Sequence, residues 1–203
     1  MKRILLLFLV GGIFLSDTVA QQIEIGGFYG YTFNTRLRTY YGDYDIKSAP
    51  NYGGQLSIGV ATDMYVELTY NRMDSEVSYY YNNLNKPLDL STEYYQIGTV
   101  REVHAGSETL VPFGLFAIGA TRFNLKESYE ELYAGDAWFM SVALGAGAKI
   151  LLGDKLGIRL QARMGLPMSF SGLYIGTGGS GASFYVPTVQ FDFTAGVFLR
   201  LGN

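Results

Sequence analysis

The stretch AWFMSVALGAGAKILLGDKLGIRLQARMGL, residues 137–166, decides the fold. Large or apolar residues occupy every second position of its first arm, namely Trp138, Met140, Val142, Leu144, Ala146, Ala148 and Ile150. The second arm repeats this pattern with Leu156, Ile158, Leu160, Ala162, Met164 and Leu166. A strict period of two predicts a β-strand whose two faces meet different surroundings. The Gly153–Asp154 step between the arms is typical of a hairpin turn.

The length of these two arms and the character of their second face point to a barrel wall. Strands of soluble sheets are usually about five or six residues long, whereas a tilted strand that crosses a membrane needs roughly 9–11 residues. The second face is small or polar, with Ser141, Gly145, Gly147, Lys149, Arg159, Gln161 and Arg163. An apolar face opposite such a face suits a membrane barrel, with lipid outside and a polar interior.

Composition excludes several classes of protein. The chain has 203 residues, no cysteine and a formal net charge of −3. Disulfides, thiolate metal sites and a lipid anchor on cysteine are therefore impossible, and the basic surface of a nucleic-acid-binding protein is not expected. Beyond the amino terminus, no apolar run approaches the roughly 20 residues that a spanning helix needs.

The amino terminus has the pattern of a secretory signal peptide. Lys2 and Arg3 precede an apolar segment at residues 4–15, and residues 18–20 form a small-x-small cleavage site. The alternative is an uncleaved membrane anchor. We therefore predict a signal peptide at residues 1–20 and a single exported barrel domain at residues 21–203.

Alternation elsewhere predicts about eight strands, at residues 21–33, 52–60, 64–73, 92–103, 110–123, 138–152, 156–166 and 189–201. The facing of residues 92–103 is ambiguous, because Arg101 shares the parity of Tyr95 and Ile97. Residues 167–185 are expected to form a Gly/Ser-rich loop. The connections alternate between long and short, which predicts an all-β, up-and-down antiparallel transmembrane barrel with both chain ends on the periplasmic side.

A soluble barrel of the lipocalin type is the alternative fold. It would place apolar residues inside and polar residues outside. Large side chains such as Trp138, Phe191 and Phe193 would overfill so small an interior, and the charged face does not suit the outside. The pattern therefore favours membrane insertion.

The mature chain resembles the small outer-membrane β-barrel family that contains the OmpA transmembrane domain, OmpX and OmpW. The resemblance rests on the architecture and on the style of residues 94–98 (YYQIG), 111–114 (VPFG) and 143–149 (ALGAGAK), and the style is similar to small barrels of Bacteroidota. It implies an outer-membrane, Gram-negative, porin-like protein. One departure is the carboxyl terminus, Leu201-Gly202-Asn203, because many such barrels end in an aromatic residue.

Charged residues at inward positions predict an interior polar network made of Glu24, Glu67, Lys149, Arg159, Arg163, Asp192 and Arg200. We expect Glu24, Arg159 and Arg200 to form one cluster and Arg163 to pair with Asp192, because buried charges need partners. Inward glycines are expected to make room for the long charged side chains: Gly26, Gly30, Gly145, Gly147 and Gly196. The network is either a selectivity element of a pore or a polar plug, and the small interior of an eight-stranded barrel favours the plug.

Aromatic residues mark the strand ends and the long loops. Tyr29, Tyr31, Tyr52, Tyr70, Tyr95, Trp138 and Phe191 suit interfacial girdles, although strand propensity alone also favours them. The loops add Tyr40, Tyr41, Tyr44, Tyr79, Tyr80, Tyr81, Tyr129, Tyr133, Tyr174 and Tyr185. These tyrosines either bind a protein or glycan partner or merely extend the sheet.

Signals for catalysis are weak. His104 is the single histidine, and it lies at a predicted periplasmic turn, away from the outer leaflet where lipid-modifying barrels act. We expect no catalytic residue, metal or cofactor. The expected role is a non-enzymatic outer-membrane barrel with a plugged interior that serves in structure, adhesion or complex formation, or as an accessory subunit of a larger secretion or assembly complex. The alternatives are a narrow channel for small solutes and a lipid-modifying enzyme.

Overall fold

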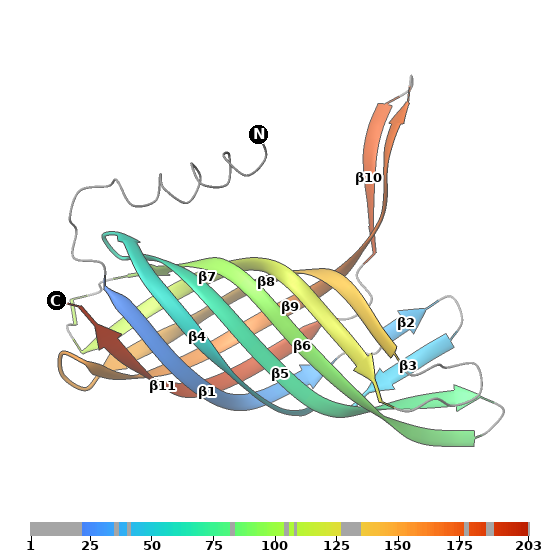
Figure 1. Cartoon of the computed structure of the whole chain (residues 1–203), viewed down its shortest axis with the longest axis horizontal. Coiled ribbons are helices and arrows are strands. Elements are labelled where there is room, and N and C mark those ends of the chain that lie inside the picture. The colour runs from blue at the N-terminus through green and yellow to red at the C-terminus, as the bar shows by residue number, and fades with distance from the viewer. Residues whose placement is uncertain are drawn as a thin grey trace, which may run out of the picture.

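The structure is a computed structural model of the whole chain (Figure 1). It describes residues 22–34, 37–39, 42–81, 84–103, 106–107, 109–126, 135–176, 179–185 and 189–202. The predicted signal peptide lies outside the described residues. Within these residues, no helix is long and apolar enough to cross a membrane.

Eight long strands form a closed antiparallel ring. They are β1 (Ile23–Asn34), β4 (Ala49–Ala61), β5 (Met64–Tyr81), β6 (Leu84–Glu102), β7 (Leu110–Leu125), β8 (Gly135–Leu151), β9 (Leu156–Gly176) and β11 (Gln190–Leu201). Each of these strands pairs with its neighbours in the chain, and the pairing of β1 with β11 closes the ring. The predicted up-and-down barrel of eight strands is therefore confirmed.

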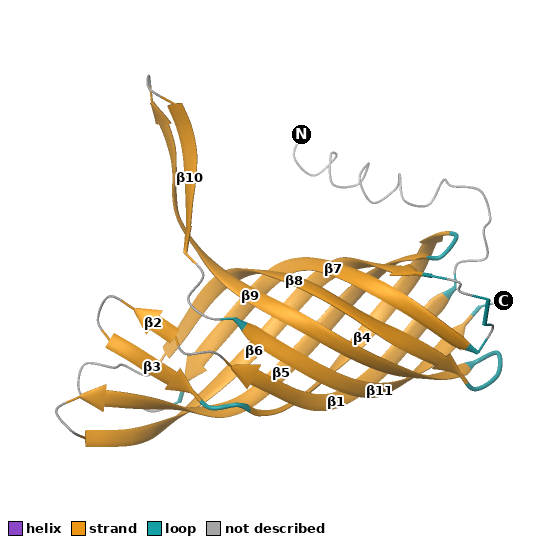
Figure 2. Ribbon diagram, turned by 180° about the vertical axis from the view of Figure 1, so that it is seen from behind, coloured by secondary structure: helices purple, strands orange, loops and turns teal. Residues whose placement is uncertain are grey.

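The two ends of the barrel differ. At one end, here called the turn end, β4–β5 and β8–β9 are joined by short turns, and β1 begins beside the end of β11 (Figure 2). Asp63 has φ 59° and Gly153 has φ 99°, so both turns use the left-handed backbone conformation that tight turns require. The opposite end, the loop end, carries the long connections.

Three further strands lie within these long connections. β2 (Leu37–Thr39) and β3 (Gly42–Ile46) form a hairpin, and β3 also pairs with the extended end of β5. β10 (Gly179–Tyr185) folds back on the end of β9. The prediction of a loop at residues 167–185 was therefore wrong, because β9 continues to Gly176 and forms a two-stranded hairpin that projects from the barrel (Figure 1).

The outward face of the ring is an apolar belt. Ile25, Leu68, Ile97, Ile118, Leu144, Leu160 and Val197 are all about half exposed. Trp138 is 58% exposed and Phe193 is 55% exposed, which excludes the lipocalin-like arrangement with apolar residues inside. Arg101 is exposed on this same face at the turn end of β6, so Tyr95, Ile97 and Arg101 all point outward.

Along the belt, the inward face carries the buried charged residues among apolar and aromatic ones, and above the belt it becomes apolar. Beyond the belt, at the loop end, the interior is closed by a hydrophobic cluster of Ile46, Ala49, Met73, Val77, Leu88, Leu90 and Phe123. The outward positions of the same strand segments carry Arg72, Asp74 and Glu93. The polarity of the wall thus reverses, which is what a wall leaving an apolar medium for water requires.

Candidate functional site

The barrel interior holds all seven side chains predicted for the polar network. Six of them are buried, namely Glu24, Glu67, Lys149, Arg159, Arg163 and Asp192, and Arg200 is largely buried. They come from β1, β5, β8, β9 and β11, and every one occupies an inward position of its strand. They are arranged in three layers along the barrel.

The layer nearest the turn end is organised by Lys149, whose exposed fraction is 0%. Its Nζ lies 2.5 Å from Glu24 Oε2 and 2.6 Å from Glu102 Oε1. Arg200 forms a second ion pair with Glu24, with 2.9 Å between Arg200 Nη2 and Glu24 Oε1. Glu24 and Arg200 face each other in the β1–β11 register, which explains why these two meet.

The middle layer is the pair of Arg159 and Glu67. Arg159 donates from both Nη atoms to the Glu67 carboxylate, at 2.5 and 3.1 Å, and Ser57 Oγ donates to the same carboxylate at 2.8 Å. The prediction that Arg159 joins Glu24 and Arg200 was wrong. Arg159 reaches instead across the interior from β9 to β5, which no pattern along a single strand reveals.

The upper layer surrounds Asp192. Arg163 pairs with it at 2.7 Å, as the sequence led us to expect. Thr32 Oγ1 donates to Asp192 at 2.7 Å, and the side-chain amides of Asn51 and Asn71 donate at 3.3 Å each. Arg163 also donates to Gln96 Oε1 at 3.1 Å. This carboxylate therefore has partners from four strands besides its own.

Aromatic rings fill the space between the layers. Lys149 Nζ lies 4.4 Å from the ring centre of Tyr65, and the Arg159 guanidinium lies 4.4 Å from that of Phe113. These distances fall within the range of cation–π attraction. The predicted purpose of the inward glycines needs a correction here: a Cβ on Gly147 would lie 2.5 Å from Phe113 Cζ, and one on Gly26 would lie 2.7 Å from the backbone oxygen of Val197. These two glycines make room for a ring and for the neighbouring backbone, not for charged side chains.

Among the described residues, the interior charges balance. Four carboxylates (Glu24, Glu67, Glu102 and Asp192) meet four cations (Lys149, Arg159, Arg163 and Arg200) in ion pairs. The hollow beside Glu67 and Arg163 has a volume of about 10 Å³, which barely admits one water molecule. The charged interior side chains of the described residues are therefore paired, and the space beside Glu67 and Arg163 is almost filled.

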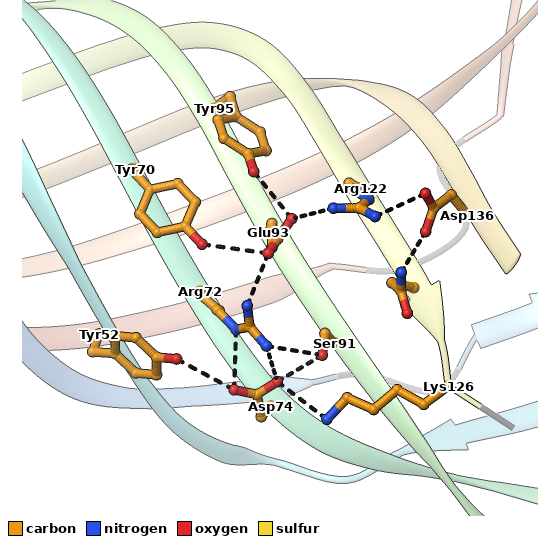
Figure 3. Close-up of polar contacts among 11 residues, drawn as sticks. Tyr52, Tyr70, Arg72, Asp74, Ser91, Glu93, Tyr95, Arg122, Lys126 and Asp136 are labelled. Atoms are coloured by element: carbon orange, nitrogen blue, oxygen red, sulfur yellow. Dashed lines mark hydrogen bonds and ion pairs between the residues drawn. The ribbon is translucent and has the colours of Figure 1, made fainter.

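A second polar network lies on the outside of the wall, beyond the apolar belt at the loop end (Figure 3). We call it the charged rim: Arg72, Asp74, Glu93, Arg122, Lys126 and Asp136. Glu93 accepts from Arg72 at 3.1 Å and from Arg122 at 3.2 Å. Arg72 also donates to the Asp74 carboxylate at 2.9 and 3.1 Å, and Arg122 donates to the Asp136 carboxylate at 2.8 Å. Alternating charges on neighbouring strands thus stabilise this row.

Aromatic side chains connect the charged rim to the belt beneath it. The hydroxyls of Tyr70 and Tyr95 donate to Glu93 at 3.4 and 3.0 Å, and that of Tyr52 donates to Asp74 at 3.4 Å (Figure 3). Tyr95 stacks on Trp138 with ring centroids 6.0 Å apart. Rings on the apolar side with hydroxyls toward the charges are the arrangement expected at a boundary between lipid and water.

Two carboxylates of the charged rim, Asp74 and Asp136, have lowered pKa values. Hydrogen bonds from the Arg72 guanidinium lower the pKa of Asp74 to about 2, against the opposing effect of partial burial. Hydrogen bonds from Arg122 likewise lower the pKa of Asp136. Asp74 and Asp136 are therefore ionised at neutral pH, beside the basic side chains of Arg72 and Arg122.

Sequence reasoning missed two groups of residues. Glu102 was not included in the predicted interior network, although its parity on β6 is that of the inward residue Gln96. The charged rim was missed because Arg72 and Glu93 were treated as strand ends. The signal that would have found them is charge at outward positions directly after Tyr70 and before Tyr95.

The structure describes only some of the tyrosines predicted to bind a partner. Tyr40, Tyr41, Tyr129 and Tyr133 lie outside the described residues, as does His104. Tyr44 lies on β3, Tyr79, Tyr80 and Tyr81 on the extended end of β5, Tyr174 on β9 and Tyr185 on β10. These strands all belong to the loop end. Among the described residues, no cluster of three or more His, Asp or Glu side chains is placed to hold a metal ion.

Comparisons with known proteins show the fold. No family model and no curated protein matches the sequence. Neisserial surface protein A matches with a TM-score of 0.58 and 11% identity, over 88% of this chain and 97% of that one. The outer membrane protein OprG from Pseudomonas aeruginosa matches with 0.55 and 12% identity, over 91% and 97%. The outer membrane protein AlkL, solved in lipid bilayers, matches with 0.53 and 11% identity, over 93% and 94%. At such low identity these likenesses concern the barrel alone, and the similarity to barrels of Bacteroidota stays a prediction.

Proposed function

We propose that this protein is an exported, non-enzymatic outer-membrane β-barrel with a plugged interior, which serves as a surface or complex-forming protein through its loop end. The single observation that carries this proposal is the pair of opposite faces on one closed wall. Apolar side chains are exposed around the outside, while balanced ion pairs fill the inside. The bilayer is the solvent in which this arrangement is stable, because lipid tolerates apolar walls and closed strand edges.

The dimensions of the belt support a position in a membrane. On β1 the outward positions from Ile23 to Phe33 carry no charge, and the same holds on β11 from Phe191 to Leu201. Each stretch has the roughly 9–11 residues that a tilted spanning strand needs. The short turns lie at one end of this belt, and the charged rim and long connections lie at the other. We therefore assign the turn end to the periplasm and the loop end to the cell surface, as in bacterial barrels of this shape.

The filled interior favours a plug over a channel. Three layers of ion pairs and the hydrophobic cluster at the loop end stand in series along the barrel axis. In planar bilayers, the purified protein is expected to show no stable unitary conductance, while its insertion is checked by the heat-dependent gel mobility of the folded barrel. A general porin added to the same bilayer is the positive control. A reproducible unitary conductance of the folded protein alone would establish the channel alternative.

The loop end supplies the surface for a partner. The hairpin of β9 and β10 projects from the barrel in both views (Figures 1 and 2), and residues 169–185 contain no charged side chain. A two-stranded hairpin is marginally stable by itself, so a partner that covers it would stabilise it. This supports a complex-forming role, including that of an accessory subunit, over a purely structural one.

Shortening this hairpin tests the complex-forming role. We expect that joining residue 171 to residue 184 through a Gly-Asp turn leaves the barrel folded but removes components that co-purify with the tagged protein in mild detergent. The β2–β3 hairpin, shortened in the same way, is the matched control. An identical set of co-purifying components in all three proteins would argue against a partner at the β9–β10 hairpin.

A further inference from the structure

Two shallow hollows interrupt the lipid-facing wall. The first, here called the wall groove, has a volume of about 670 Å³ and is lined by Ile25, Gly54, Leu56, Leu68, Tyr70 and Tyr95 among others. The second has a volume of about 750 Å³, and its lining combines small residues such as Ala146 and Ala195 with Tyr29, Tyr31, Leu160 and Phe193. The two hollows are alike in size and in apolar character, but their surroundings differ.

Only the wall groove lies directly beneath the charged rim. Tyr70 and Tyr95 belong to both, because their rings line the groove while their hydroxyls donate to Glu93 of the rim. Above the second hollow, the outward positions of β1, β9 and β11 carry Phe33, Met164 and Phe191. Among described residues, therefore, the wall groove joins an apolar floor to a charged upper edge and the second hollow does not.

The apolar belt is also thinnest beside the wall groove. On β6 the outward charges Arg101 and Glu93 stand eight positions apart, about 27 Å along the strand. With a strand tilt of 35–45°, this spans about 20 Å of the membrane, less than the usual apolar band of about 25 Å. On β8 the outward positions from Trp138 to Ile150 carry no charge over about 40 Å of strand. The headgroup layer must therefore meet the wall at the charged rim.

The charged rim offers a lipid headgroup both cationic groups and carboxylates. Arg72, Arg122 and Lys126 attract phosphate, whereas the ionised carboxylates of Asp74 and Asp136 accept from hydroxyl or amine donors. The rim extends from β5 to β8, three strand spacings or about 14 Å. Tyr95 and Trp138 present stacked rings at its lower edge. A phosphorylated sugar headgroup matches this width and this mixture of groups better than a compact glycerophospholipid headgroup does.

We propose that the wall groove and the charged rim form a binding site for one phosphorylated glycolipid of the outer leaflet. One acyl chain occupies the wall groove beneath Tyr70 and Tyr95, and the phosphorylated sugar lies across Arg72, Glu93 and Arg122. This inference rests on the proposed membrane position, but not on the plugged interior or on a partner at the loops.

Trp138 provides a built-in probe, because it is the single tryptophan of the chain and stacks on Tyr95 at the groove. The protein is reconstituted in vesicles of a phosphatidylcholine with brominated acyl chains, which quench tryptophan on contact. A non-brominated, phosphorylated disaccharide lipid is then mixed in. We expect Trp138 fluorescence to recover at a mole fraction of this disaccharide lipid about tenfold lower than the mole fraction that ideal mixing of the lipids predicts. Non-brominated phosphatidylethanolamine is expected to follow ideal mixing.

Two variants locate the binding site. Gly54→Leu fills the wall groove, and the structure allows it, because a Cβ there has its nearest neighbour at 3.4 Å. Ala195→Leu fills the second hollow to a similar extent and is the matched control. Gly54→Leu and the double variant Arg72→Gln/Arg122→Gln are expected to lose the early recovery, whereas Ala195→Leu keeps it.

The outcomes separate this inference from the proposed function. Quenching of Trp138 by brominated lipid, without preference for the glycolipid, would overturn the lipid site and leave the membrane position intact. Equal behaviour of Gly54→Leu and Ala195→Leu would also overturn it. No quenching at all in the folded protein would contradict the membrane position and the lipid site together.

Discussion

Replacing Lys149 with methionine is expected to lower the free energy of unfolding by about 3–5 kcal/mol. Methionine keeps most of the side-chain volume, so the effect is mainly electrostatic. Glu24 would retain Arg200, but Glu102 would lose the ion pair that it makes with Lys149 at 2.6 Å while it stays buried. The measurement is denaturant unfolding in detergent micelles or vesicles, followed by Trp138 fluorescence or by gel mobility.

Two controls make this prediction specific. Lys155→Met removes the same side chain from an exposed turn position and is expected to change stability by less than about 0.5 kcal/mol. Adding Glu102→Gln to Lys149→Met is expected to recover a large part of the loss, because no uncompensated carboxylate remains. Equal stabilities of the Lys149 and Lys155 variants would contradict the assignment of Lys149 as the centre of the layer at the turn end.

Replacing Gly30 with alanine is expected to cost about 1–3 kcal/mol through overpacking of the wall. Gly30 faces inward, and a Cβ at this position would lie 2.8 Å from the Thr194 Cα and would collide with the backbone oxygen of Phe193. Both obstacles belong to the paired strand β11, so they cannot rotate away as a side chain would. The same unfolding measurement checks this result.

Gly27 on the same strand is the matched control for Gly30. It faces outward, and a Cβ there would meet its nearest neighbour, the backbone oxygen of Gly53, at 3.7 Å. Gly27→Ala is expected to be neutral or stabilising by up to about 1 kcal/mol, because alanine has less conformational freedom in the unfolded chain. A similar loss in both alanine variants would show that close strand contact at Gly30 is not the cause.

Much of the fold was predictable because the faces of a strand are a local property. Residues two apart share a face, so the parity of Leu160 and Phe193 outward and of Arg159 and Asp192 inward followed from the letters alone. The strand count followed from the rhythm of long and short connections. The hairpin at β10 was not predicted, because its Gly/Ser-rich sequence has little strand propensity.

The charged partners were predictable only where they stand on neighbouring strands near equal depth. Arg163 and Asp192 face each other in the β9–β11 register, and so do Glu24 and Arg200 in the β1–β11 register. Arg159 and Glu67 lie on β9 and β5, which do not pair. The contact between Arg159 and Glu67 depends on the stagger of the strands around the closed ring, and the sequence of a single strand does not reveal this stagger.

By itself, the sequence determined the barrel, its two faces and the residues that turn inward, because alternation acts between neighbours in the chain. The tertiary structure alone decided the pairing of Arg159 with Glu67 and the inclusion of Glu102 in the interior network. It alone also decided the assembly of the charged rim above the wall groove. These depend on ring closure, which brings β1 against β11 and sets the depth of each strand relative to the others. The polarity reversal beyond Tyr70 and Tyr95 depends on both the sequence and the tertiary structure. The sequence contains the change in residue type, but only the aligned strands show that it forms one continuous boundary.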